Sequence, residues 1–122
     1  MSTPRTIRRF LLLEGASFVT AALVHSGLLV QGYAHRKAAI AESVIATVLL
    51  GGLVLTVVRP VWTRRVGLGA QAFALAGTAV GVFTIIVGVG PRTAPDIAYH
   101  MAILAVLTAG LLAAKSAPPD AP

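Results

Sequence analysis

The chain has no cysteine and few charged residues. Of its 122 residues, four are Asp or Glu, and only 11% are charged in total. The lack of cysteine excludes disulfide bonds, thiolate metal sites and nucleophilic thiols. The small charged fraction, together with 57% apolar residues, excludes an ordinary water-soluble domain. The composition therefore indicates a membrane protein.

Long apolar runs occupy most of the chain. A membrane-spanning helix needs about 20 mostly apolar residues to cross about 30 Å of hydrocarbon. The runs predict four transmembrane helices, at about residues 10–30, 38–58, 66–90 and 97–114. Because the connections are short, we expect an all-α four-helix bundle of up-down-up-down order. The bundle forms one transmembrane domain over residues 1–122, and we expect a disordered tail at 116–122. No room remains for a soluble catalytic module.

The basic residues are distributed unequally between the two sides of this expected bundle. Seven lie on the side of the termini and three on the other side. The seven are Arg5, Arg8, Arg9, Arg59, Arg64, Arg65 and Lys115, and the three are Arg36, Lys37 and Arg92. The positive-inside rule then places both termini in the cytoplasm, and we expect the plasma (inner) membrane. We interpret the net charge of +6 as orienting the protein in the lipid bilayer, so nucleic acid is not an expected partner.

Small residues recur along one face of the third predicted span. They follow one another at intervals of three and four: Gly67, Ala70, Ala74, Gly77, Gly81, Thr84 and Gly88. Helices in lipid associate through close backbone approach, which small residues permit, and Gly77 and Gly81 form a GxxxG motif. We expect these residues to make a packing seam, and a second copy of the chain to be a candidate partner along it.

Four ionisable residues lie inside the predicted spans, where a charge costs roughly 3 kcal/mol or more. They are Glu14, His25, Glu42 and His100. Such residues normally face a protein interior or a wet cavity, so each is a candidate for binding or relaying protons or a cation. His25, Glu42 and His100 are expected in the outer half of the bundle.

The first predicted span carries a polar stripe. Eleven residues at 100° each return almost to the starting angle, so Glu14, Ser17, Ala21 and His25 share one helix face. His25 lies about 16 Å further out than Glu14 at 1.5 Å per residue. The stripe is consistent with the wall of an internal path, but Glu14 can instead pair with Arg8 or Arg9 or reach the headgroups.

Metal and haem binding are weaker alternatives for the same residues. His25, Glu42 and His100 match the residue types of an open zinc site, and His25 and His100 could ligate a haem from two helices. No local spacing supports either, because the ligands would come from three separate spans. Histidines that hydrogen-bond in a polar core are the simpler interpretation.

Two residues near the span ends have structural interpretations. Thr93 and Asp96 have the spacing of a capping box at a helix N-terminus, with Thr93 as the cap. His35 lies in an outer loop beside Arg36 and Lys37, where we expect it to be solvated. Capping is favoured over ligand or proton binding for Asp96.

Three functional hypotheses follow from these residues. We expect a small membrane protein that binds or relays protons or a cation as a transporter-like or accessory unit. A structural membrane subunit without its own chemistry is the second hypothesis, with Glu14 and Glu42 joining helices. The third is a membrane-embedded enzyme that uses His25, Glu42 and His100 on a lipid-like substrate, for which no motif is present.

Overall fold

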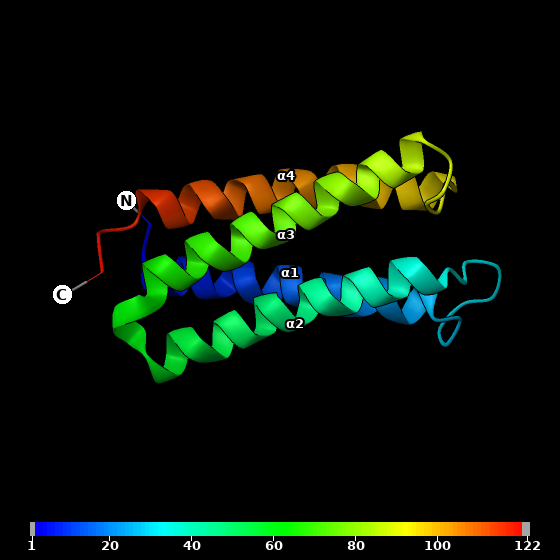
Figure 1. Ribbon diagram of the computed structural model, residues 1–122. Coiled ribbons are helices and arrows are strands. Elements are labelled where there is room, and N and C mark those ends of the chain that lie inside the picture. The colour runs from blue at the N-terminus through cyan, green and yellow to red at the C-terminus, as the bar shows by residue number, and fades with distance from the viewer. Residues whose placement is uncertain (1, 121–122) are drawn as a thin grey trace.

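The computed structural model describes residues 2–120, and over that range every regular element is helical. The elements are α1 (Pro4–His25), α2 (Arg36–Val58), the short 3-10 helix η1 (Pro60–Trp62), α3 (Thr63–Ile86) and α4 (Ala94–Ser116). Successive long helices run in opposite directions, as Figure 1 shows. Both termini and the α2–α3 turn lie at one end of the bundle, which we call the termini end, and the other two loops lie at the loop end.

Local signals set the limits of the first helix. It begins at Pro4 rather than near residue 10 because the Thr3 side chain accepts a hydrogen bond from the Thr6 N–H and Pro4 occupies the first turn. It ends at His25, since Gly27 has a φ of 82° that stops a right-handed helix. The first helix is therefore displaced toward the N-terminus from its expected range.

The third helix also ends earlier than expected, four residues before the end of the predicted range 66–90. Its last residue is Ile86, and Gly88 follows with a φ of 85°. The Thr84 carbonyl accepts hydrogen bonds from both Val89 and Gly90, each at 2.9 Å. Gly88 therefore belongs to the α3–α4 loop, which corrects its expected place in the packing seam.

Three helical segments are long and apolar enough to cross a membrane: α2, the η1–α3 segment Pro60–Ile86, and α4. Helix α1 has 22 residues, which is about 33 Å at 1.5 Å per residue. It is less apolar because Arg8, Arg9 and Glu14 lie within it. The expected all-α bundle is thus present, with three of its four helices meeting the composition of a membrane span.

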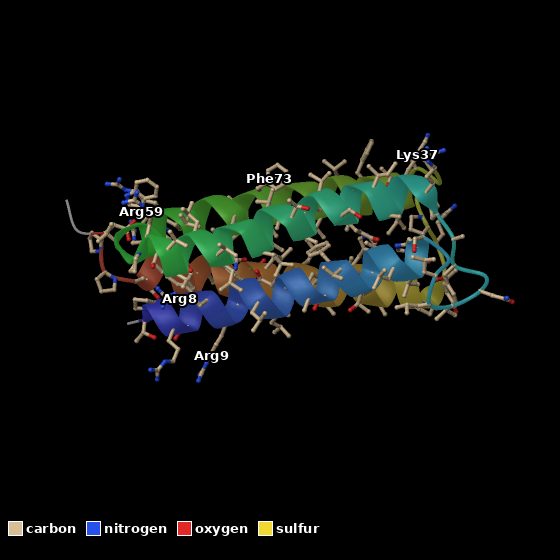
Figure 2. The ribbon with its side chains drawn as sticks, turned by 90° about the horizontal axis from the view of Figure 1, so that it is seen from below. Arg8, Arg9, Lys37, Arg59 and Phe73 are labelled. Carbon is tan, nitrogen blue, oxygen red and sulfur yellow. The ribbon has the colours of Figure 1, made fainter. Side chains whose placement is uncertain are left out.

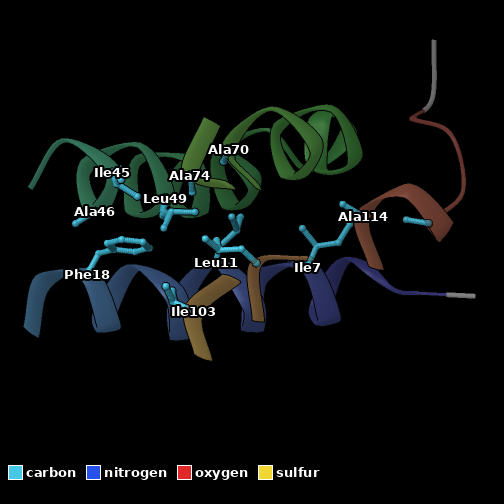
Figure 3. Packing of buried hydrophobic residues seen from close by; sticks show 12 residues of the cluster. Ile7, Leu11, Phe18, Ile45, Ala46, Leu49, Ala70, Ala74, Ile103 and Ala114 are labelled. Carbon is cyan, nitrogen blue, oxygen red and sulfur yellow. The ribbon is translucent and has the colours of Figure 1, made fainter. Parts of the chain in front are cut away.

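The interior is made of aliphatic, small and a few polar side chains, whereas large apolar side chains cover the exterior. Figure 3 shows Leu11, Phe18, Leu49 and Ile103 packed between the helices. The exterior carries many exposed residues such as Phe73, which Figure 2 shows pointing outward. A surface of this kind suits contact with lipid and favours a membrane location.

The α3 seam lies against the chain's own helices. A Cβ atom added at Gly67 would come within 2.7 Å of Ile7, and one added at Gly77 within 2.9 Å of Ile45. At Gly81 the nearest atom is His100 Nε2 at 3.2 Å. Ala70 and Ala74 are buried on the same helix. In this arrangement α1, α2 and α4 each contact the seam at one of these glycines. A second copy as the partner of this face stays a prediction.

The C-terminal tail is attached to α3. Helix α4 continues to Ser116, and the Asp120 carboxylate accepts hydrogen bonds from the backbone N–H groups of Arg64 at 2.9 Å and Arg65 at 2.8 Å. This differs from the disordered tail expected from residue 116, because Asp120 supplies the acceptor that the start of α3 lacks locally. Residues 121–122 lie outside the described range.

Candidate functional site

A single buried imidazole joins three helices at the loop end. His25 Nδ1 lies 2.8 Å from both carboxylate oxygens of Glu42 on α2, and its Nε2 lies 2.8 Å from Asp96 Oδ1 on α4. The exposed fractions are 4% for His25, 5% for Glu42 and 6% for Asp96. We call these three residues the His25 cluster.

Helix ends bring the three residues together. His25 is the last residue of α1, Glu42 lies in the second turn of α2 and Asp96 in the first turn of α4. All three positions are at the loop end, where α1 and α3 end and α2 and α4 begin. The cluster therefore depends on the antiparallel order of the bundle.

Asp96 has a second role that holds its carboxylate in place. The Asp96 N–H donates to Thr93 Oγ1 at 3.3 Å, and the Thr93 N–H and hydroxyl both donate to Asp96 Oδ2. The expected capping box is therefore confirmed. It occupies Oδ2 and leaves Oδ1 for His25. Sequence reasoning recognised the cap and missed the histidine contact, which spans 71 residues.

The hydrogen bonds link the charge of His25 to the ionisation of the two carboxyl groups. An ionised carboxylate only accepts hydrogen bonds, so with both carboxylates ionised each His25 ring nitrogen must donate. His25 is then an imidazolium, and the cluster carries a net charge of −1. Within residues 2–120, neither carboxylate forms an ion pair with Lys or Arg. Loss of the imidazolium proton would leave two buried negative charges, which is costly, and a further proton would neutralise the cluster.

His100 lies beside the cluster without joining its side chains. Its Nδ1 is 2.7 Å from the Asp96 backbone oxygen. A carbonyl oxygen only accepts, so Nδ1 carries the hydrogen and Nε2 of the neutral ring is a free acceptor. The residue is 8% exposed and packs against Gly81 of α3, so it faces the bundle rather than lipid or a second copy.

Glu14 occupies a separate position nearer the termini end. Glu14 and Gln71 are fully buried, and both approach Gly110 of α4 so closely that an added Cβ would lie 2.6 Å from each side chain. Arg8 does not pair with Glu14: it donates to the Thr56 backbone oxygen at 2.6 Å. The alternative in which Arg8 neutralises Glu14 is therefore wrong.

An apolar layer separates Glu14 from the His25 cluster. The two residues are eleven positions apart on α1, which corresponds to about 16 Å. Phe18, Ile45 and Ile103 are buried between these levels (Figure 3). The polar stripe expected along α1 is thus divided into two buried polar positions with an apolar section between them.

His35 joins the two loops at the loop end. Its Nδ1 accepts a hydrogen bond from the Ala38 N–H at 3.2 Å, which caps α2, and its Nε2 donates to the Val89 carbonyl oxygen at 3.1 Å. Both ring nitrogens are thus engaged, in contrast to the freely solvated loop histidine expected from its neighbours.

The donor set does not fit the metal or haem site considered as an alternative for these residues. Among residues 2–120, no group of three His, Asp or Glu residues is arranged to hold a metal ion. Both nitrogens of His25 are engaged by carboxylates, and Nδ1 of His100 is engaged by a carbonyl. Zinc or haem ligation by His25 would require one of the buried contacts to break.

Comparisons of the chain with protein-family models, with curated proteins and with solved structures find no match. The fold and the site together define an apolar-surfaced helical bundle with a buried carboxylate–imidazole–carboxylate cluster. Because a helical bundle supports many functions, the fold alone does not identify an activity, and the chemistry of the cluster is the better guide.

Proposed function

We propose that this chain is a four-span integral membrane protein that binds and relays protons through intramembrane carboxylates and histidine. It acts as a transporter-like or accessory unit of the plasma membrane, with both termini in the cytoplasm. The observation that carries the proposal is the position of His25 between Glu42 and Asp96, each residue more than nine-tenths buried. Ionisable groups are placed in a membrane interior mainly for function.

The membrane part of the proposal is supported by the distribution of apolar and basic residues. Large apolar side chains are exposed on all four long helices, for example Leu12, Val54, Phe83 and Leu112. Figure 2 shows Arg8, Arg9 and Arg59 near the termini end, whereas Lys37 lies near the loop end. Because α1 packs within the bundle, it would cross the bilayer with the other three helices.

The proton-binding part is supported by the access to the cluster as well as by its charge. A cavity of about 420 Å³ borders His25 and Asp96 on the side of α1 and α4, and Tyr33 of the α1–α2 loop also lines it. Water in this cavity would connect the imidazole to the loop end. The Glu14 position then provides a second carboxylate further along the bundle, beyond the apolar layer.

A structural role is the alternative, and the same cluster supports it. Two hydrogen-bonded contacts tie α1 to α2 and α4 through one side chain, which would stabilise the bundle without any chemistry. The two functions differ in their need for a titrating carboxylate. Glutamine can still accept a hydrogen bond from His25, but it cannot exchange a proton as glutamate does.

Proton flux into liposomes tests the proposal. The purified protein is reconstituted with a pH-sensitive dye inside the vesicles, and a potassium diffusion potential drives proton entry. We expect flux above that of protein-free vesicles, and Glu42→Gln should lower it by at least about tenfold. Asp120→Asn removes a carboxylate outside the cluster and should leave the flux unchanged. Wild-type flux equal to that of empty vesicles, or full flux in Glu42→Gln, would favour the structural role.

A further inference from the structure

A second cavity borders the His25 cluster from the opposite side. It lies between α2 and α3 at the loop end and has a volume of about 290 Å³. Glu42 and His100 line it together with Phe18 and Ile45, and the contact between His35 and Val89 lies at its outer end. We call it the α2–α3 cavity.

The polar side chains of the inner lining, Glu42, Thr78, Thr84 and His100, offer acceptors to the α2–α3 cavity. His100 Nε2 has no hydrogen in the neutral ring, because Nδ1 donates to the Asp96 carbonyl. The Thr78 hydroxyl donates to the Ala74 carbonyl and the Thr84 hydroxyl to the Gly81 carbonyl, each at 2.7 Å, so only their lone pairs remain. The ionised Glu42 carboxylate also only accepts. A ligand that forms hydrogen bonds with these acceptors must supply hydrogen-bond donors.

The charge of the surroundings adds a preference for a cation. With both carboxylates ionised, the cluster of Glu42, His25 and Asp96 carries a net charge of −1. Of the described residues that line the cavity, Lys37 alone is Lys or Arg, and its side chain is exposed. His35 donates its single N–H to Val89 and offers no charge. A cation in the cavity would therefore lie at short range from this buried net negative charge.

The remaining lining limits the size and polarity of the ligand. Phe18, Ile45 and Val80 supply apolar surface. A volume of about 290 Å³ is at the lower limit of small-molecule pockets, which suits a body no larger than about one aromatic ring.

We propose that the α2–α3 cavity binds a small organic ammonium ion, with its N–H groups donating to Glu42 and to His100 Nε2 and its apolar body against Phe18 and Ile45. The inference rests on the proposed function, because the ligand and the proton of the His25 cluster share the Glu42 carboxylate. Binding of one therefore weakens binding of the other. The substrate class of the transporter-like unit would be small lipophilic amines.

Calorimetric titration of the detergent-solubilised protein tests the inference with three probes of one shape: benzylammonium, benzyl alcohol and phenylacetate. We expect benzylammonium to bind, and the neutral and anionic probes to bind at least about tenfold more weakly, a difference of 1.4 kcal/mol or more. Absence of benzylammonium binding, or equal affinity for benzyl alcohol, would overturn the inference.

A pair of glycine variants locates the binding site. In Gly81→Ala the new methyl group would lie about 3.2 Å from His100 Nε2 and cover it, whereas an added Cβ at Gly69 of the same helix meets no atom within 4 Å. We expect Gly81→Ala to weaken benzylammonium binding at least about tenfold and Gly69→Ala to leave it unchanged. Unchanged binding in Gly81→Ala would place the ligand elsewhere and overturn the inference.

The flux assay separates this inference from the proposed function. Gly81→Ala leaves the His25 cluster intact, so it should retain proton flux while losing amine binding. If benzylammonium fails to bind but the wild-type flux depends on Glu42, only the ligand site is wrong. If benzylammonium binds and no proton flux occurs, only the relay is wrong.

Discussion

Asp96 and Asp120 each accept hydrogen bonds from backbone N–H groups at the start of a helix, but only Asp96 also contacts a buried histidine. The two residues therefore offer a matched comparison at the residue scale. The Asp120 carboxylate caps the start of α3. The Asp96 carboxylate caps the start of α4 and also contacts His25. The difference between them measures what the cluster adds to stability.

Asp96→Ala should lower the free energy of unfolding by about 2–4 kcal/mol, because it removes a cap and leaves the buried His25 Nε2 without its acceptor. Asp120→Ala should cost about 1 kcal/mol, as for loss of a cap alone. Denaturation of the reconstituted variants in mixed micelles measures both values. Equal losses would mean that the Asp96–His25 contact contributes nothing to stability.

Gly110 is the residue that makes space for the second buried carboxylate. Gly110→Ala should destabilise the bundle by about 1–3 kcal/mol, because the new Cβ would lie 2.6 Å from both Glu14 Oε1 and Gln71 Nε2. Gly51→Ala is the control, since an added Cβ there meets no atom within 4 Å. The cost should shrink when Glu14→Ala is combined with Gly110→Ala. If the cost is unchanged in the double variant, Glu14 is not the group that Gly110 accommodates.

At the scale of the helices, the seam on α3 explains how the bundle closes. Gly67 and Gly69 lie two positions apart on α3 but face different surroundings. The first meets Ile7 of α1, and the second faces open space. Close approach of α3 to α1 therefore depends on one face of the helix and not on its overall glycine content.

Gly67→Leu should lower the thermal stability of the detergent-solubilised protein by several degrees, corresponding to about 1–3 kcal/mol, because the side chain would push α1 away. Gly69→Leu on the exposed face should have little effect. Thermal unfolding followed by circular dichroism gives the comparison. If both variants have the midpoint temperature of the wild type, Gly67 is not a packing position.

The number and order of the helices could be predicted from the long apolar runs and the short connections between them. The residues at which the helices begin and end could be predicted only approximately. Helix α1 differs from its expected range because Thr3 caps its start and Gly27 has a positive φ just after its end. Helix α3 ends early because Gly88 has a positive φ. Capping signals were decisive where the sequence showed both partners close together, as at Thr93 and Asp96. The link between Asp120 and α3 spans more than fifty residues and has no local signature.

The candidate site was predictable in type but not in composition. The cost of burying charge singled out His25 and Glu42, and their common depth follows from the order of the spans. The participation of Asp96 depends on how α1 and α4 are rotated about their axes, which the sequence does not specify. The same rotation directs Arg8 toward Thr56 and away from Glu14.

Directional proton transfer by the whole bundle requires a fixed orientation in the bilayer. Seven basic residues at the termini end and three at the loop end predict that the termini face the cytoplasm. The His25 cluster then lies near the outer surface and Glu14 nearer the inner one. The absence of cysteine from the sequence makes this orientation measurable with single introduced thiols.

Gln31→Cys in the α1–α2 loop should react with a membrane-impermeant maleimide on intact cells, and Ser116→Cys at the end of α4 should react only after the cells are broken. Both side chains are exposed, so a difference in labelling reports the side of the membrane. Labelling of both thiols on intact cells would contradict the single orientation.

Nitrogen-15 magnetic resonance of the labelled histidines in lipid bilayers tests whether His25 holds an exchangeable proton between Glu42 and Asp96. We expect one imidazolium signal at neutral pH that is lost in His25→Asn and retained in His35→Asn. The same signal should convert to that of a neutral ring when the pH is raised. A His25 ring that is neutral at neutral pH, or one whose protonation never changes with pH, would contradict this expectation.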